Sequence, residues 1–309
     1  MIYDNVLDAM GNTPIIRLRR MVDEDMADVL VKFEGVNIGG SVKTRPAYAM
    51  IATAERFGGL KPGKVVVEPT SGNQGIGLAL ICAVKGYRCI IIMPDSVSEE
   101  RYKLCRHYGA EVMLIHDEGD IGECIDRCTA TAERMAEEDP NVFLPQQFVN
   151  YNNVRAHYSM TGEEIVSQVS RSIDGFCAGV GTGGTLSGVG KVLRAENPDI
   201  EIWAVEPENA AILSGGEVGS HIQMGIGDGL IPSILDEDVY DDVAVVTDEE
   251  ALKTAKDLAR LEGIACGISS GSNVAAALRL ARKLGPGKTV VTICPDTAER
   301  YYSTPLFDE

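Results

Sequence analysis

A lysine in a short glycine-containing segment is the side chain of this sequence best suited to covalent chemistry. Residues 37–45 read NIGGSVKTR, and Gly39 and Gly40 permit a tight turn there. Ser41 can cap a helix whose first turn contains Lys43. The positive end of a helix and burial both lower the pKa of a lysine, and a neutral amine can act as a nucleophile or form a Schiff base. A surface lysine is the alternative interpretation of this segment taken alone.

Two further loops have the composition of anion-binding sites. Residues 69–77 read PTSGNQGIG and lie between the apolar runs KVVVE and LALICAV, which predicts a strand, a tight loop and a helix. Residues 179–188 read GVGTGGTLSG and open a second helix. Backbone N–H groups at the start of a helix favour a carboxylate or a phosphate. The second loop lacks the G-K-[ST] ending of a nucleotide-binding loop, and a tight turn without a ligand is its alternative interpretation.

Two more segments follow apolar runs in the last third of the chain. Residues 266–273 read CGISSGSN and precede a helical pattern, so their serines could bind a ligand or only cap that helix. Residues 293–304 read ICPDTAERYYST at the end of a predicted strand. Open α/β sheets bind ligands at such strand ends. Taken together, these loops predict a small, anionic, phosphorylated ligand that meets a lysine.

Apolar runs alternate with helical patterns along the whole chain. The predicted strands are 28–34, 64–68, 88–94, 111–115, 175–180, 201–207 and 289–295. The predicted helices are 43–57, 73–85, 98–108, 120–138, 150–169, 184–196, 249–263 and 271–284. This alternation predicts an α/β fold with a largely parallel sheet covered by helices on both faces. A boundary is expected near 146–151, and the glycine-rich segment 208–248 is expected to form loops.

Length and composition restrict the class of protein. A chain of 309 residues suits two compact lobes or one large α/β domain. The net charge of −18 argues against nucleic-acid binding, and no apolar run is long enough to span a membrane. No signal-peptide pattern is visible, so a cytoplasmic location is expected. The eight cysteines include no C-x-x-C pair, and we expect buried, reduced thiols and no metal site.

The order and separation of five segments resemble a known family. SVK at 41–43, PTSGN, GTGGT, GISSGS and CPDTAERY follow one another as in the cysteine synthase (O-acetylserine sulfhydrylase) and cystathionine β-synthase family, from GNTPIIRL at 11–18 to RYYST at 300–304. The resemblance implies a pyridoxal 5'-phosphate enzyme of fold type II, the tryptophan-synthase-β fold. It implies two lobes, each with a mostly parallel twisted sheet covered by helices, and a cofactor in the cleft between them. The smaller lobe is expected at 40–146, and the larger at 1–39 plus 147–309.

The resemblance also implies roles for single residues. Lys43 should carry the cofactor and act as the catalytic base, Asn73 should bind the cofactor's ring hydroxyl, and Ser269 should face its ring nitrogen. The residues expected to bind the cofactor phosphate are Gly181, Thr182, Gly183, Gly184 and Thr185. The residues that it implies at the α-carboxylate of the amino-acid substrate are Thr70, Ser71, Asn73 and Gln147. Gln74 and Asp228, which depart from the family pattern, are also expected at the substrate.

The implied reaction is β-replacement on a serine-derived amino acid through an α-aminoacrylate intermediate. Cysteine synthesis from O-acetylserine and sulfide is the first expectation, with a small nucleophile and a homodimeric enzyme. Replacement on cysteine, releasing hydrogen sulfide and forming serine, lanthionine or a related product, is the second. A cofactor-binding regulator without turnover is a distant third.

Two departures from the family pattern concern the substrate. Gln74 stands where the family usually has a threonine, and its longer amide either reaches the substrate or points outward. Asp228 stands where cysteine synthases usually have a small residue. Its carboxylate could orient or deprotonate an incoming nucleophile, or it could be a solvated loop residue.

Overall fold

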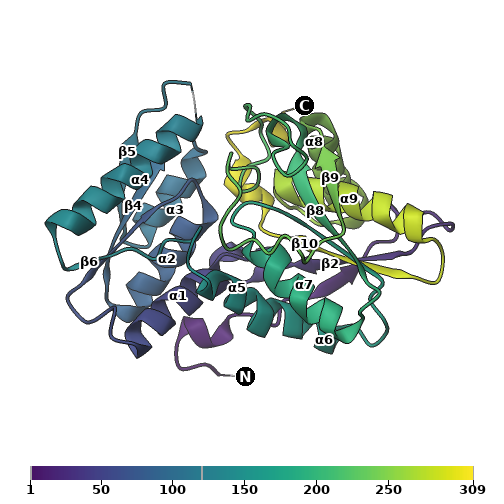
Figure 1. Cartoon of the computed structure of the whole chain (residues 1–309), viewed down its shortest axis with the longest axis horizontal. Coiled ribbons are helices and arrows are strands. Elements are labelled where there is room, and N and C mark those ends of the chain that lie inside the picture. The colour runs from purple at the N-terminus through teal and green to yellow at the C-terminus, as the bar shows by residue number, and fades with distance from the viewer. Residues whose placement is uncertain (1, 120, 309) are drawn as a thin grey trace.

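The chain folds into two lobes, and each lobe contains one sheet with helices packed against it (Figure 1). This computed structural model describes residues 2–119 and 121–308. The six-stranded sheet has the order β1 (Ile15–Arg17), β2 (Asp28–Phe33), β10 (Thr289–Cys294), β7 (Gly175–Gly179), β8 (Glu201–Pro207) and β9 (Asp242–Val246). The four-stranded sheet has the order β5 (Glu111–Ile115), β4 (Arg88–Pro94), β3 (Val65–Pro69) and β6 (Val142–Phe143). The pairing of β1 with β2 is antiparallel, and the other pairings in the two sheets are parallel.

The helices lie between the strands, as parallel pairing requires. The α-helices are α1 (Thr44–Arg56), α2 (Asn73–Lys85), α3 (Glu99–His107), α4 (Ile121–Glu138), α5 (Asn152–Ala156), α6 (Glu163–Gln168), α7 (Gly184–Glu196), α8 (Asp248–Asp257) and α9 (Ile268–Leu284). Two π-helical turns extend helices, at His157–Gly162 and Leu258–Glu262. Short 3-10 turns occur at Val6–Ala9, Glu34–Val36, Ile38–Gly40, Glu208–Ala210, Ala298–Tyr301 and Pro305–Phe307.

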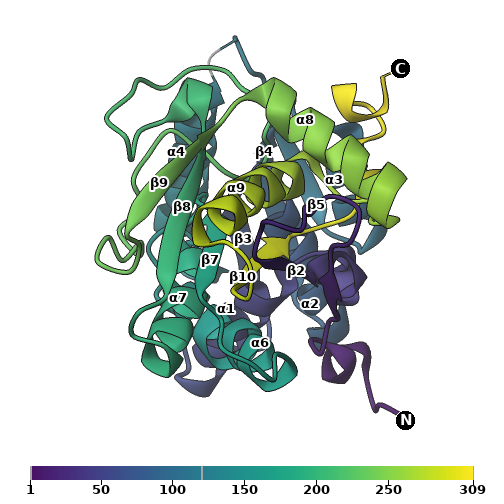
Figure 2. The same cartoon turned by 90° about the vertical axis from the view of Figure 1, so that its right-hand side faces the viewer.

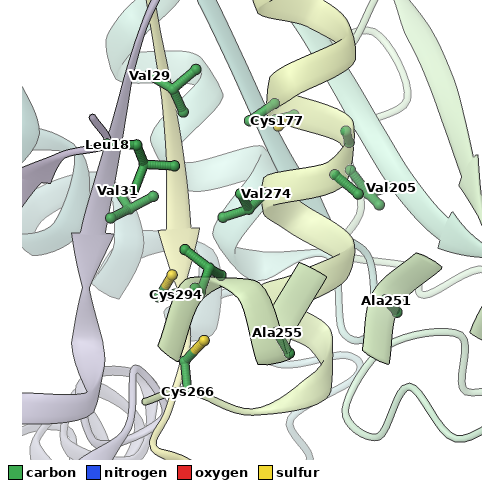
Figure 3. Close-up of a cluster of buried hydrophobic side chains, with 14 of the residues drawn as sticks. Leu18, Val29, Val31, Cys177, Val205, Ala251, Ala255, Cys266, Val274 and Cys294 are labelled. Carbon is green, nitrogen blue, oxygen red and sulfur yellow. The ribbon is translucent and has the colours of Figure 1, made fainter. Parts of the chain in front are cut away.

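The central strands of both sheets are buried on both faces, whereas the edge strand β5 is partly exposed. In the four-stranded sheet, Val65 and Val67 pack with α4, whereas Val66 packs with α1, α2 and α3. In the six-stranded sheet, α8 and α9 cover one face and α6 and α7 cover the other, and Figure 2 shows α8 and α9 in front of the strands. Figure 3 shows Val274 of α9 among side chains of the strands it covers. Burial on both faces explains why the strands read as continuous apolar runs.

The predicted two-lobed α/β fold is confirmed, and some of its elements differ from the sequence prediction. All seven predicted strands are present, but β9 lies inside 208–248, where only loops were expected, and β1 and β6 were not predicted. The helix expected at 150–169 is interrupted by a π-helical turn. Residue 120, where a helix was expected to begin, lies outside the described residues. The lobe boundaries at 40 and 146 remain a prediction.

Thiols, metal ligands and membrane spans can be checked within the described part of the chain. All eight cysteines are free and, as predicted, buried. Residues 2–119 and 121–308 contain no group of three or more histidine, cysteine or acidic side chains arranged to hold a metal ion. No helix among these residues has the length and apolarity needed to cross a bilayer.

A buried ion-pair cluster fixes the start of α1 against the larger lobe. The guanidinium of Arg45 donates to both carboxylate oxygens of Glu34, each at 2.8 Å, and to those of Glu164 at 2.7 and 2.8 Å. Lys32 donates to Glu164 at 2.7 Å. Burial alone would raise the pKa of Glu164, but the hydrogen bonds from Arg45 and Lys32 lower it to about 2.

We expect Glu164→Gln to destabilise the protein. Breaking a buried ion pair from one side typically costs about 3–5 kcal/mol, because it leaves the partner charges uncompensated. Since folding lowers the Glu164 pKa from 4.5 to about 2, the wild-type advantage is present above pH 4.5 and is lost as the pH falls toward 2. Urea denaturation from pH 3 to 7 measures this difference. Glu111→Gln, which breaks the exposed pair with Arg88, is the control and should change stability by under about 1 kcal/mol. Equal effects of the two variants would contradict the assignment.

Candidate active site

A cleft of about 910 Å³, including its open mouth, lies between the two lobes. Segments at the carboxyl ends of β3, β7 and β10 contribute to it, which is where open parallel sheets bind ligands. The residues that line it include twelve that were predicted from the sequence to form the site: Lys43, Thr70, Ser71, Asn73, Gln74, Gln147, Gly181, Thr182, Gly183, Thr185, Asp228 and Ser269. The fold therefore brings every predicted site residue except Gly184 to one cavity, and Gly184 begins α7 directly behind it.

Lys43 directly precedes α1 and lines the cleft. The side chain is half-buried, and burial lowers its pKa below the usual value. The nearby Asp228 carboxylate acts in the opposite direction. Lowering the pKa increases the fraction of neutral amine, which is the form that attacks carbonyl groups and accepts protons.

The loop between β7 and α7 is a cradle for an anion. Gly183 has φ +77° at the start of α7, and no side chain caps this helix. A Cβ on Gly181 would clash with the Gly225 carbonyl oxygen, and one on Gly184 would clash with the Asn153 amide. Glycine is therefore required by space at both positions. The uncapped N–H groups of the helix remain available for a phosphate, so this loop fits the phosphate group of pyridoxal phosphate.

His157 lies behind the same loop and was not among the predicted site residues. Its side chain is fully buried, with Nδ1 3.0 Å from Thr161 Oγ1 and Nε2 3.3 Å from Thr185 Oγ1. Burial, together with the charges of Lys43 and Arg45, lowers the His157 pKa well below its usual value. The imidazole is therefore neutral and holds Thr185 through a hydrogen bond. His157 lies 28 residues from Thr185 in sequence, so the contact between them is created by the fold.

Ser269 occupies the first turn of α9, at the wall of the cleft formed by the larger lobe. The helix begins earlier than predicted, at Ile268, so Ser269 is a helical residue and not a loop residue. Asn273, one turn later, accepts from the Gly179 N–H at 2.7 Å and donates to the Ile293 carbonyl at 2.8 Å. These bonds fix Ser269 relative to the ends of β7 and β10.

Gln74 points into the cleft and not to solvent. It is the second residue of α2, it is 1% exposed, and it lines the cavity. Neither its amide nitrogen nor its amide oxygen has a hydrogen-bond partner in the structure. Buried polar atoms without partners are costly, so a ligand group in the cleft is the natural partner for this amide.

Asn73 is held by residues from the far end of the chain. Its amide nitrogen donates to Asp296 Oδ2 at 2.6 Å, and its amide oxygen accepts from Arg300 Nε at 2.9 Å. Arg101 of α3 donates to the Ser71 carbonyl at 3.0 Å and to the Tyr301 hydroxyl at 3.2 Å. Segment 296–301 thus joins the loop after β3 in the smaller lobe to the larger lobe. No role was predicted for Arg101, Asp296 or Arg300, and Arg101 lies 200 positions from Tyr301 in sequence.

Asp228 lies in the cleft and is half-buried, so it is not a solvated loop residue. A Cβ on Gly181 would lie 3.1 Å from its Oδ2 atom, which places the carboxylate beside the phosphate cradle. Burial raises the Asp228 pKa, and the charges of Lys43, His221 and Arg101 partly offset this effect. The carboxylate is close enough to Lys43 for each to affect the other's ionisation.

The two-lobed fold, the lysine and the phosphate cradle define an enzyme that uses pyridoxal phosphate. A family model described as "Pyridoxal-phosphate dependent enzyme" matches residues 6–296, and the chain belongs to this family. The chain is 49% identical over 305 residues to a cysteine synthase of Staphylococcus aureus (strain Mu50 / ATCC 700699), covering 98% of this chain and 97% of that protein. Membership favours an enzyme over the non-catalytic regulator considered above.

Solved structures agree with this assignment. An O-ureido-L-serine synthase superposes with a TM-score of 0.94 at 41% identity, covering 100% of this chain and 96% of that one. A hydrogen sulfide-producing enzyme of Fusobacterium nucleatum superposes with a TM-score of 0.92 at 39% identity, covering 97% and 100%. The chain is accordingly a pyridoxal-phosphate-dependent β-replacement enzyme, as the sequence predicted.

We expect Gly181→Ala to weaken cofactor binding by roughly tenfold or more, since each hydrogen bond to a charged group contributes about 1.5–3 kcal/mol and the added Cβ displaces the loop from the Gly225 carbonyl. Titration of the cofactor-free protein with pyridoxal phosphate, followed by visible absorbance, measures the affinity. Gly59→Ala is the matched control, because its Cβ would meet only Ala54 O at 3.7 Å. An unchanged affinity in Gly181→Ala would show that this loop does not hold the phosphate.

Proposed function

We propose that this β-replacement enzyme makes cysteine from O-acetylserine and sulfide. The observation that carries the proposal is the meeting of three parts in one cleft: the Lys43 amine, the uncapped start of α7 and the unpartnered Gln74 amide. Together they offer a nucleophile, a phosphate site and a site for a second polar ligand. An amino acid bound beside a phosphorylated cofactor matches this combination.

Each side chain of the cofactor site has a distinct proposed role. The phosphate binds the loop made by Gly181, Thr182, Gly183, Gly184 and Thr185, with His157 holding Thr185 from behind. Ser269 faces the ring nitrogen and Lys43 holds the cofactor covalently. Asn73 binds the ring hydroxyl, and its orientation is already set by Asp296 and Arg300.

The substrate carboxylate binds between the loop after β3 and the turn at residue 147. Thr70 and Ser71 provide hydroxyl and backbone donors there, and Gln147 lines the same cleft. Gln74 donates its amide N–H to the same carboxylate, which satisfies a buried group that otherwise has no partner. A donor set of neutral amides and hydroxyls orients a carboxylate and leaves the charges of Lys43 and Asp228 for the chemistry.

Lys43 moves the proton in the central step. The bound cofactor supplies an electron sink that makes the Cα–H bond of the amino acid acidic. The Lys43 Nζ atom accepts that proton, and burial favours the neutral amine that can do so. The acetate of O-acetylserine then leaves as the Cβ–O bond breaks, and sulfide forms the new bond to Cβ. Sulfide is largely ionised near neutral pH and requires no base.

We expect Lys43→Ala to lower the rate of cysteine formation by roughly 10²–10⁴-fold, the usual contribution of a positioned proton-transfer group. The assay supplies O-acetylserine and sulfide to the holoenzyme and measures cysteine colorimetrically. Lys61→Ala, at an exposed lysine outside the cleft, is the control and should behave as wild type. A Lys43→Ala enzyme with wild-type turnover would rule out the proposed role.

Asp228 favours a second candidate function, replacement on cysteine with release of hydrogen sulfide. Its half-buried carboxylate lines the cleft and interacts with Lys43. Burial raises the Asp228 pKa toward neutral pH, and a general base works best when its pKa lies near the pH of the reaction. Water or a thiol, unlike sulfide, needs such a base to attack Cβ. Water gives serine and a second cysteine gives lanthionine, each with one hydrogen sulfide released.

We expect Asp228→Asn to reduce sulfide release from cysteine by roughly 10²-fold, because the amide cannot accept the nucleophile's proton. Cysteine synthesis from O-acetylserine and sulfide should change by only a few-fold. Sulfide trapping and amino-acid analysis measure the two reactions on the same preparation. Asp117→Asn, in the wall of the neighbouring pocket and not of the cleft, is the control. Equal losses in both reactions would contradict a base specific to the second.

A homodimer in the cytoplasm is the proposed setting. A surface groove lined by Val6, Ile38, Leu80 and Val84 is apolar, and Val6 and Val84 are exposed in the single chain. A second copy would cover such a surface. The eight free thiols suit a reducing compartment.

A further inference from the structure

Glu68 is a buried carboxylate that has no cationic partner. It lies on β3, two residues before Thr70, and is 1% exposed. In the described part of the chain it forms no ion pair, and its hydrogen-bond donors are two backbone N–H groups: Gln146 donates to Oε2 at 2.8 Å and Gln147 donates to Oε1 at 2.9 Å. A buried acid without a cation is unfavourable for folding, so its position calls for a specific explanation.

The turn that Glu68 holds is strained. Gln146 has φ +58°, in the left-handed region that residues other than glycine rarely adopt. Such a conformation persists only where surrounding contacts enforce it. The two N–H groups that Glu68 accepts belong to this residue and to the next, so the carboxylate enforces the turn directly.

The turn connects the substrate site with the phosphate cradle. Gln147 is 5% exposed and lines the cleft. Its carbonyl accepts from the Asn153 amide at 3.0 Å, and the same amide donates to Thr182 Oγ1 at 2.9 Å. A shift of Gln147 would therefore alter both the surface facing the substrate and the support of Thr182.

We propose that Glu68 is a positioning residue that holds Gln147 for the substrate's α-carboxylate, and that the enzyme's affinity for its amino-acid donor follows the ionisation of Glu68. This inference rests on the proposed function, in which Gln147 contacts that carboxylate. The ionised carboxylate accepts both N–H groups. The protonated form has one hydroxyl, which must donate its own hydrogen and is a poorer acceptor, so one side of the turn is released.

The ionisation falls in the working range of pH. Burial raises the Glu68 pKa from 4.5 to about 7, and the two backbone hydrogen bonds lower it only in part. The titratable group that interacts with Glu68 is the thiol of Cys89 on β4, and Cys82 of α2 and Cys105 of α3 interact with Cys89 in turn. The other titratable side chains packed on this side of the sheet are tyrosines: Tyr48, Tyr87, Tyr102 and Tyr108. Burial raises the pKa of Cys105 to about 12, and a hydrogen bond with Cys82 together with burial raises the pKa of Cys89 well above its usual value, so Cys89 and Cys105 stay neutral. The folding stability that protonation of Glu68 provides is lost as the pH rises from 4.5 to about 7.

Steady-state kinetics of the holoenzyme with O-acetylserine, from pH 6 to 8.5, test the proposal. In the wild type, KM for O-acetylserine should rise as the pH falls through about 7, with a smaller change in kcat. Glu68→Gln should have a KM raised by roughly tenfold, as for loss of one hydrogen bond to a charged group, and should lose this inflection. Glu68→Asp keeps the charge and should restore the inflection. Titration of the substrate's own amino group is common to all variants and cancels in the comparison.

Hydrogen exchange of the Gln146 and Gln147 amides in the cofactor-free protein tests the positioning itself. After correction for intrinsic rates, wild-type protection should increase as the pH rises through about 7, and Glu68→Gln should lack the increase. Glu55→Gln, which removes a partly exposed ion pair in the same lobe, is the control for both experiments. Wild-type kinetics and wild-type exchange in Glu68→Gln would overturn the inference. A wild-type enzyme that does not use O-acetylserine would contradict the proposed function, and the exchange experiment would then decide the role of Glu68 alone.

Discussion

The position of Lys43 depends on the ion pairs that the buried guanidinium of Arg45 forms. Arg45 follows Lys43 by two residues and is bound on one side by Glu34 and on the other by Glu164. These partners belong to the larger lobe, whereas α1, of which Arg45 is the second residue, packs in the smaller one. Lys43 is thus fixed at the junction of the lobes, in the wall of the cleft between them. The positive charge of Arg45 is compensated by Glu34 and Glu164, outside the cleft. Few charged side chains line the cleft itself.

Removal from water determines how the few charged groups of the cleft behave. Burial shifts Lys43 toward its neutral form and raises the pKa of Asp228, so both are drawn toward the range where protons are exchanged readily. Burial lowers the His157 pKa well below its usual value, and the imidazole supports Thr185 through a hydrogen bond. Donors to the ligand are mainly backbone N–H groups, hydroxyls and amides, which bind anions without competing for protons. The same physical effect, desolvation, therefore separates the groups that transfer protons from those that only position.

The strands and the glycine loops could be predicted from sequence because their signals are local. Seven strands appear as apolar runs, and the cradle at 181–185 is visible as glycine and threonine before a helix. The contacts of Arg101 and Asn73 with segment 296–301 could not be predicted, since nothing local indicates a partner about 200 residues away. The orientation of Gln74 and the attachment of Glu68 to the turn at 146–147 likewise depend on how β3 and its loop pack. Edge strand β9 has a short apolar run, DVAVV, and was missed because the glycine-rich stretch before it led to the expectation of loops throughout 208–248.

The central claim is that the cofactor is held by Lys43 in the cleft between the lobes. Borohydride reduction of the purified holoenzyme fixes the cofactor covalently to the amine that carries it, and peptide mass spectrometry then identifies that amine. The account predicts a single modified peptide, containing Lys43, and loss of this modification when O-acetylserine is added in excess before reduction. Modification of a different lysine, or of none, would contradict the account.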